Sequence, residues 1–196
     1  AQVDSRLVMR RNHQQHQDND APLVLVGQQL ELLAIKVDGE LLTSADYLLE
    51  GDLLTIYKIS NDFELEISNR IEPQNNTALE GLYKSSGMFC TQCEAEGFRR
   101  ITYYLDRPDV MSIFTTEVIA DKASYPILLS NGNAVAQSEL SAGRHSITWH
   151  DPHKKPCYLF ALVAGDLMVK EGDFTTMSGR EVELKIFVEP QNIDKT

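Results

Sequence analysis

The sequence predicts an all-β protein, built as a sandwich or saddle of antiparallel strands, on three observations. Apolar and polar residues alternate with a period of two in most segments, turn residues separate these segments, and no long segment has the period of a helix. Such alternation is typical of antiparallel strands that bury one face. The chain has 196 residues, enough for one large domain or two small ones. We expect residues 1–190 to form a single β domain and residues 191–196 to begin a linker.

Alternation is clearest in three segments, where apolar side chains occupy one face of an extended chain and polar ones the other. These segments are VDSRLVMR (3–10), FELEIS (63–68) and EVELKIFV (181–188). Weaker versions of the pattern predict strands over residues 30–37, 53–59, 101–105, 114–120, 125–130, 134–140 and 145–150. The continuously apolar CYLFALVAG (157–165) predicts a strand that is buried on both faces at the centre of a sheet.

Turn residues lie between several of these segments. Glycine after Asp, Asn or Ser favours the tight turns of β-hairpins, because those turns need backbone conformations with positive φ. Hairpins are therefore expected at Asp38-Gly39, Asn131-Gly132-Asn133 and Ser178-Gly179. After Pro108, residues 109–114 are expected to form a single helical turn.

The charge balance limits the possible partners. There are 18 basic and 29 acidic side chains, which give a net charge of −11. This charge repels phosphate backbones, so no nucleic-acid partner is expected, whereas cationic groups are favoured. No segment approaches the roughly 18 consecutive apolar residues of a membrane helix, and the first residues do not have the layout of a signal peptide. With only three cysteines, the expectation is a cytoplasmic protein that has reduced thiols and no membrane partner.

Cys90 and Cys93 form a C-x-x-C pair, which in other settings chelates zinc or cycles as a dithiol. His150, His153 and Cys157 could complete a zinc site, but the spacing fits no familiar zinc motif. We expect reduced, partly buried thiols and no metal. In HQQH (13–16), Gln14 stands where a zinc protease needs glutamate, so no catalytic zinc is expected in this chain.

Gln92, Glu94 and Glu96 alternate along CTQCEAEGF (90–98). On an extended strand, their side chains would share one face and form an acceptor-rich surface suited to an ammonium group. The structural alternative is a solvated face in which Glu96 pairs with Arg99 or Arg100. A second local feature, DRPD (106–109), is expected to be a turn held by salt bridges.

Three longer segments resemble the N-terminal domain of bacterial aminopeptidase N, a zinc metallo-aminopeptidase of the gluzincin class. They are NTALEGLYKSSGMFCTQCEAEGFRRITYYLDRPDV (76–110), FTTEVIADKASYPILLSNGN (114–133) and KPCYLFALVAGDL (155–167). The resemblance runs from about residue 21 to the end. It implies a saddle-shaped, β-sandwich-like domain that sits on a thermolysin-like catalytic domain, and it implies that the family's opening strands are lacking here.

The resemblance also implies the roles of the site residues. Glu94 falls on the glutamate that holds the free α-amino group of a peptide substrate, and Gln92 falls on a residue that lines the first specificity pocket. Glu96 matches no residue with an assigned role. Zinc and the catalytic residues would belong to the catalytic domain of the full-length parent, since this chain contains neither H-E-x-x-H nor G-A-M-E-N. The expected partners are peptides with a free N-terminus and that catalytic domain, and the chain alone is expected to be inactive.

Two other hypotheses remain open from the sequence. One is a free-standing β-sandwich module that binds peptide or carbohydrate. The other is a structural domain stapled by zinc through Cys90, Cys93, His150 and His153.

Overall fold

The computed structural model describes residues 1–12 and 21–196 and confirms the all-β class. Within these residues, every strand pair is antiparallel. The strands are β1 (Gln2–Arg10), β2 (Leu23–Val26), β3 (Glu31–Val37), β4 (Glu40–Leu41), β5 (Tyr47–Glu50), β6 (Leu53–Ile56), β7 (Asp62–Arg70), β8 (Gly81–Ser85), β9 (Met88–Gln92), β10 (Met111–Asp121), β11 (Ile127–Ser130), β12 (Asn133–Glu139), β13 (Arg144–Pro156), β14 (Leu162–Gly165), β15 (Met168–Thr175) and β16 (Glu181–Val188). Short 3-10 turns are η1 (Pro73–Asn75), η2 (Phe98–Arg100), η3 (Ser141–Gly143), η4 (Cys157–Leu159) and η5 (Pro190–Lys195).

The N-terminal half consists of two sheets with one core between them. One sheet has the order β1-β7-β3-β4 and the other β2-β6-β5. The alternation seen in FELEIS is realised in β7, where Phe63, Leu65 and Ile67 are buried and the residues between them are not. These side chains pack against Leu25 of β2 and Leu54 of β6, so hydrophobic burial holds the two sheets together.

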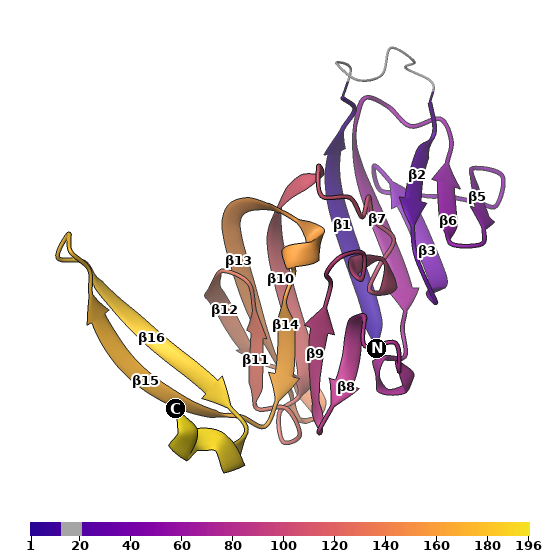
Figure 1. Cartoon of the computed structure of the whole chain (residues 1–196). Coiled ribbons are helices and arrows are strands. Elements are labelled where there is room, and N and C mark those ends of the chain that lie inside the picture. The colour runs from indigo at the N-terminus through magenta and orange to yellow at the C-terminus, as the bar shows by residue number, and fades with distance from the viewer. Residues whose placement is uncertain (13–20) are drawn as a thin grey trace.

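The second half also pairs two sheets, of orders β11-β14-β9-β8 and β10-β13-β12. A small core between them includes Val118 of β10 and Leu128 of β11. A third cluster, around Phe98 and Tyr104, receives Leu7 from the first half and Phe114 from the second, and thus joins the halves. Figure 1 shows the two halves side by side, with the β15–β16 hairpin projecting away from them.

Several details of the predicted strands are corrected. Residues 101–105 do not form a strand: Ile101 to Tyr104 are buried, but their only ladder contact is an isolated bridge between Tyr104 and Val26. Of residues 157–165, only Leu162–Gly165 form a strand, β14; it lies inside its sheet as expected, but Leu162 and Val163 are only partly buried. The turn expected at 109–114 lies earlier, at residues 107–110, because β10 already begins at Met111.

Two of the three expected hairpin turns are confirmed. Asp38-Gly39 joins β3 to β4, and Ser178-Gly179 lies between β15 and β16. Gly132, however, follows β11 in one sheet and precedes β12 in another, so the chain changes sheets there. A Cβ atom on Gly132 would lie 2.2 Å from the carbonyl oxygen of His150, so a larger residue does not fit there. The positive φ of this residue also favours glycine.

The predicted domain limits stay predictions. β16 ends at Val188, and η5 then covers most of the expected linker. The expectation that opening strands are lacking also stays untested; among the described strands, β1 pairs only with β7, and its other edge has no partner.

Candidate functional site

Glu94 lies on a turn, and not on the strand that the spacing predicted. β9 ends at Gln92, residues 93–97 form the turn, and η2 follows. The amide of Gly97 donates to the carbonyl oxygen of Cys93 at 2.9 Å and closes the turn. The prediction that Gln92, Glu94 and Glu96 share one strand face is therefore wrong.

Two buried residues explain why the chain turns here. Cys93 is 2% exposed and packs in the cluster that joins the two halves, so the chain leaves the strand direction at this residue. Gly97 approaches three backbone atoms closely: an added Cβ would lie 2.5 Å from the carbonyl oxygen of Gln92, 3.0 Å from the Cα of Cys93 and 3.0 Å from the amide nitrogen of Gly81. Only glycine fits this approach without a shift of the chain.

The acidic side chains near this turn differ in their partners. Glu96 pairs with Arg99 at 3.2 Å, as the structural alternative had it, and Glu80 pairs with Arg100 at 3.2 Å. Glu94 is exposed, and within residues 1–12 and 21–196 its carboxylate has no hydrogen-bond or ion-pair partner. The Gln92 side-chain amide donates to the backbone carbonyl of Glu94 at 3.3 Å, which places Gln92 beside the turn. Glu94 is thus the acidic group at this turn whose carboxylate is available to bind an external cation.

A buried polar cluster lies behind the turn. The Asp106 side chain, 2% exposed, accepts hydrogen bonds from the Arg99 guanidinium and from the Cys157 thiol. Burial, followed by the nearby Asp106 charge, raises the pKa of the Cys93 thiol to about 12. Burial and the hydrogen bond to Asp106 likewise raise the pKa of Cys157. Both thiols therefore stay protonated near neutral pH and are poor nucleophiles.

Sequence reasoning missed this role of Asp106. DRPD was expected to be a turn held by its own salt bridges, and Arg107 does pair with Asp109 at 3.0 Å. Asp106 instead pairs with Arg99, seven residues earlier. The signal that could have indicated this is position: Asp106 directly follows the apolar run 101–105, so its carboxylate is carried into the interior and needs a cation there.

The proposed zinc-staple residues are not assembled. Cys90 lies half-buried on β9, Cys93 points into the core, and the imidazole Nδ1 of His150 hydrogen-bonds Thr115 at 2.9 Å. Among the residues that the structure describes, no group of three or more His, Cys, Asp or Glu side chains is placed to hold a metal ion. His13 and His16 lie outside the described residues.

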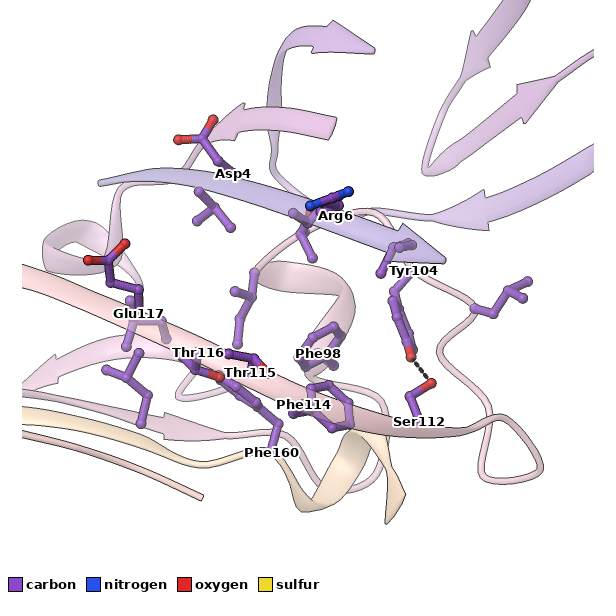
Figure 2. A pocket seen from close by; sticks show the side chains of 18 of the residues that line it. Asp4, Arg6, Phe98, Tyr104, Ser112, Phe114, Thr115, Thr116, Glu117 and Phe160 are labelled. Carbon is purple, nitrogen blue, oxygen red and sulfur yellow. Dashed lines mark hydrogen bonds between the residues drawn. The ribbon is translucent and has the colours of Figure 1, made fainter. Parts of the chain in front are cut away.

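A large groove lies elsewhere on the molecule. It has a volume of about 1860 Å³ and runs between β1 and β10, lined by residues 1–12 and 111–121 among others. Figure 2 shows the rings of Phe98, Phe114 and Phe160 gathered there, and the hydrogen bond of 2.7 Å between Tyr104 and Ser112. Neither Gln92 nor Glu94 lines this groove, so the described part of the chain presents Glu94 on an open surface. No helix in the described residues is long and apolar enough to span a membrane.

Comparisons with known proteins point to one family. A family model described as the Peptidase M1 N-terminal domain matches residues 3–159. Aminopeptidase N of Escherichia coli is 56% identical over 180 residues, covering 92% of this chain and 20% of that protein. Aminopeptidase N of Caulobacter vibrioides is 50% identical over 188 residues, covering 96% of this chain and 21% of that protein. The chain thus spans about a fifth of the length of these relatives.

Solved structures give the same picture of the fold. The structure of Legionella pneumophila aminopeptidase A in complex with aspartic acid superposes with a TM-score of 0.94 at 37% identity, covering 99% of this chain and 23% of that one. An M1 zinc metallopeptidase from Deinococcus radiodurans, bound to a Tyr-Ser-Ala substrate, superposes with a TM-score of 0.74 at 17% identity, covering 94% of this chain and 42% of that one. At that identity the second likeness shows the fold alone.

Proposed function

The chain belongs to the Peptidase M1 N-terminal domain family, and from this premise we propose that it is the substrate-anchoring part of a zinc-dependent aminopeptidase. In this proposal the full-length enzyme removes N-terminal amino acids from peptides. Glu94 binds the free α-amino group of the substrate, and Gln92 lines the pocket for the first side chain.

The observation that carries the proposal is the carboxylate of Glu94, exposed at the turn and without a partner in the described residues. An aminopeptidase must recognise a chain end, and only that end of a peptide backbone carries an ammonium group. One charge-assisted hydrogen bond contributes about 1.5–3 kcal/mol. An internal peptide amide has no charge to offer, so this contact favours free N-termini and sets the register of the substrate. Because the ammonium persists through the reaction, the contact serves mainly to orient the substrate.

Among the described residues, no group of three or more His, Cys, Asp or Glu side chains is placed to hold a zinc ion. The proposal therefore assigns zinc and the catalytic residues to a catalytic domain of the same polypeptide, and it assigns no chemical step to the residues described here. The 196-residue chain alone is expected to have no peptidase activity. A free-standing β-sandwich module that binds peptide or carbohydrate is the weaker alternative, because both aminopeptidase N relatives match more than nine-tenths of the chain.

We also propose a cytoplasmic location and no nucleic-acid or membrane partner. The net charge of −11 and the three unpaired thiols support this.

The test compares Glu94→Gln with Glu96→Gln in the full-length enzyme. Loss of one charge-assisted hydrogen bond should lower kcat/KM for an aminoacyl-anilide by about 10–100-fold in Glu94→Gln. Glu96→Gln is the matched control: its carboxylate already pairs with Arg99, and it should change kcat/KM by less than about threefold. Equal kinetics for Glu94→Gln and the unmodified enzyme would contradict the anchor role.

A further inference from the structure

The turn that carries Glu94 is held from behind by one buried carboxylate. Asp106 is 2% exposed at its side chain. Its Oδ2 accepts from the Arg99 Nε at 2.8 Å and from the Arg99 backbone amide at 3.1 Å, and its Oδ1 accepts from the Cys157 thiol at 3.0 Å. A buried carboxylate with three donors is well compensated, and removal of its charge leaves those donors without their acceptor.

Arg99 connects this carboxylate to the far side of the turn. Besides the bond from Nε, Nη2 of Arg99 donates to the backbone carbonyl of Asp106 at 3.2 Å. The guanidinium is planar, so these two contacts on Asp106 also fix the direction of Nη1. That nitrogen lies 3.2 Å from Oε2 of Glu96, on the turn itself. The Arg99 side chain is only 15% exposed, whereas the Glu96 side chain is 69% exposed, so the rigid end of this chain of contacts is at Asp106.

The near side of the turn is held by packing around the same carboxylate. Cys93 is the first residue of the turn and lies in one buried cluster with Cys157, whose thiol binds Asp106. Both ends of the turn are therefore tied to Asp106, through Cys93 at the start and through the backbone amide of Arg99, two residues after its end. The Glu94 carboxylate, between these ends, has no contact of its own that would hold it in the described residues.

We propose that Asp106 is a positioning residue for Glu94. It acts in two ways: it fixes the turn in space, and it keeps the Arg99 guanidinium occupied. Arg99 already reaches Glu96, so a guanidinium released from Asp106 would be a mobile cation next to Glu94 and would compete there with the substrate ammonium. This inference rests on the proposed function, since it needs Glu94 to bind the substrate amine.

The experiment uses four variants of the full-length enzyme: Asp106→Asn, Glu94→Gln, the double variant, and Asp109→Asn. Asp109 is the matched control, an exposed acid of the same DRPD segment whose partner is Arg107 and not Arg99. For each variant, kcat and KM are measured with an aminoacyl-anilide. The inhibition constants of an amino-acid amide and of its des-amino analogue are measured as well.

Asp106→Asn is expected to lower kcat/KM by about tenfold, because small misplacement of a positioning group is costly. It should raise the inhibition constant of the amino-acid amide by a similar factor and leave the inhibition constant of the des-amino analogue unchanged. In the Glu94→Gln background the same substitution should change kcat/KM by less than about twofold, since a contact already lost cannot be misplaced. Asp109→Asn should match the unmodified enzyme.

Other outcomes separate the two proposals. One outcome is that Asp106→Asn lowers kcat/KM by the same factor in the unmodified enzyme and in Glu94→Gln, or raises both inhibition constants equally. Asp106 is then merely structural and the inference is overturned, while the anchor role of Glu94 stands. If Glu94→Gln alone leaves kcat/KM unchanged, the anchor role of Glu94 and the positioning role of Asp106 are both overturned. If Asp106→Asn does not fold, as judged by circular dichroism and its thermal midpoint, Arg99→Lys takes its place, because one ammonium cannot bind the side chain and the backbone carbonyl of Asp106 as the guanidinium does. The same non-additivity with Glu94→Gln is then required, and its absence overturns the inference.

Discussion

Gly97 closes the Glu94 turn, and replacing it with alanine should destabilise the fold by a predictable amount. The backbone of Gly97 has φ −84°, which alanine adopts freely, so the cost is purely steric. The added Cβ would lie 2.5 Å from the Gln92 carbonyl oxygen, 3.0 Å from Cys93 Cα and 3.0 Å from the Gly81 amide nitrogen. All three are backbone atoms, so none can rotate away as a flexible side chain would, and the turn itself must shift.

Overpacking of this kind costs about 1–3 kcal/mol. For a chain of this size, each kcal/mol lowers the thermal midpoint by about 2–4 °C, so Gly97→Ala should lower it by about 2–12 °C. Calorimetry or circular dichroism measures this shift. Because the strained contacts involve Cys93, the first residue of the turn, and Gln92 just before it, Glu94 should be displaced and kcat/KM of the full-length enzyme should fall as well.

Gly172→Ala is the matched control for this substitution. Gly172 lies in the exposed hairpin strand β15, and an added Cβ would meet no heavy atom within 4 Å. Alanine there should leave stability unchanged or raise it by about 0.4–1 kcal/mol, through the reduced entropy of the unfolded chain. A midpoint for Gly97→Ala within about 1 °C of the unmodified protein would refute the steric reasoning, given the sensitivity expected for this size.

Two further predictions concern the thiols and acid stability. A disulfide reagent should modify one thiol in the native 196-residue chain, the half-buried Cys90. Cys93 and Cys157 should not react, because both are buried and burial raises the pKa of each thiol. A native Cys90→Ser chain that still reacts with the reagent would contradict this prediction. The backbone amide and hydroxyl of Thr43 both donate to Asp46 and lower its pKa. A lowered pKa contributes stability above the unfolded value of about 3.9, and this contribution is lost as pH falls through the folded value. Asp46→Asn should therefore lower the free energy of unfolding at about pH 6, with a gap that closes as pH falls towards about 2; a gap that does not depend on pH would speak against this assignment.

Local patterning was enough to predict many of the strands. In β7 the period of two is imposed by one buried and one solvated face, so Phe63, Leu65 and Ile67 could be assigned to a core before their partners were known. Asp38-Gly39 could be assigned to a hairpin for a similar reason, since both residues adopt positive φ and join strands that are neighbours in the sequence. In both cases the physics is contained within a few consecutive residues.

The errors arose where distant contacts decide the structure. Gly132 has the local signature of a hairpin, but its turn is set by the backbone of His150 on another strand. The spacing of Glu94 and Glu96 fits a strand, but burial of Cys93 and the close packing of Gly97 impose a turn. The role proposed for Glu94 came from resemblance, and the absence of a partner for its carboxylate within the described residues came only from the structure.

Under the proposed function, the turn has a consequence for specificity that a strand would not have. On a strand face, Glu94 and Glu96 would point the same way about 7 Å apart, and both would attract cations. On the observed turn, Arg99 binds Glu96 and is itself held by Asp106, so one of the two carboxylates already has a partner within the chain. Glu94 then remains as the carboxylate of this turn that has no hydrogen-bond or ion-pair partner within the described residues. A polyamine or metal ion, which gains from two carboxylates at once, has less to gain here than a peptide with one charged end.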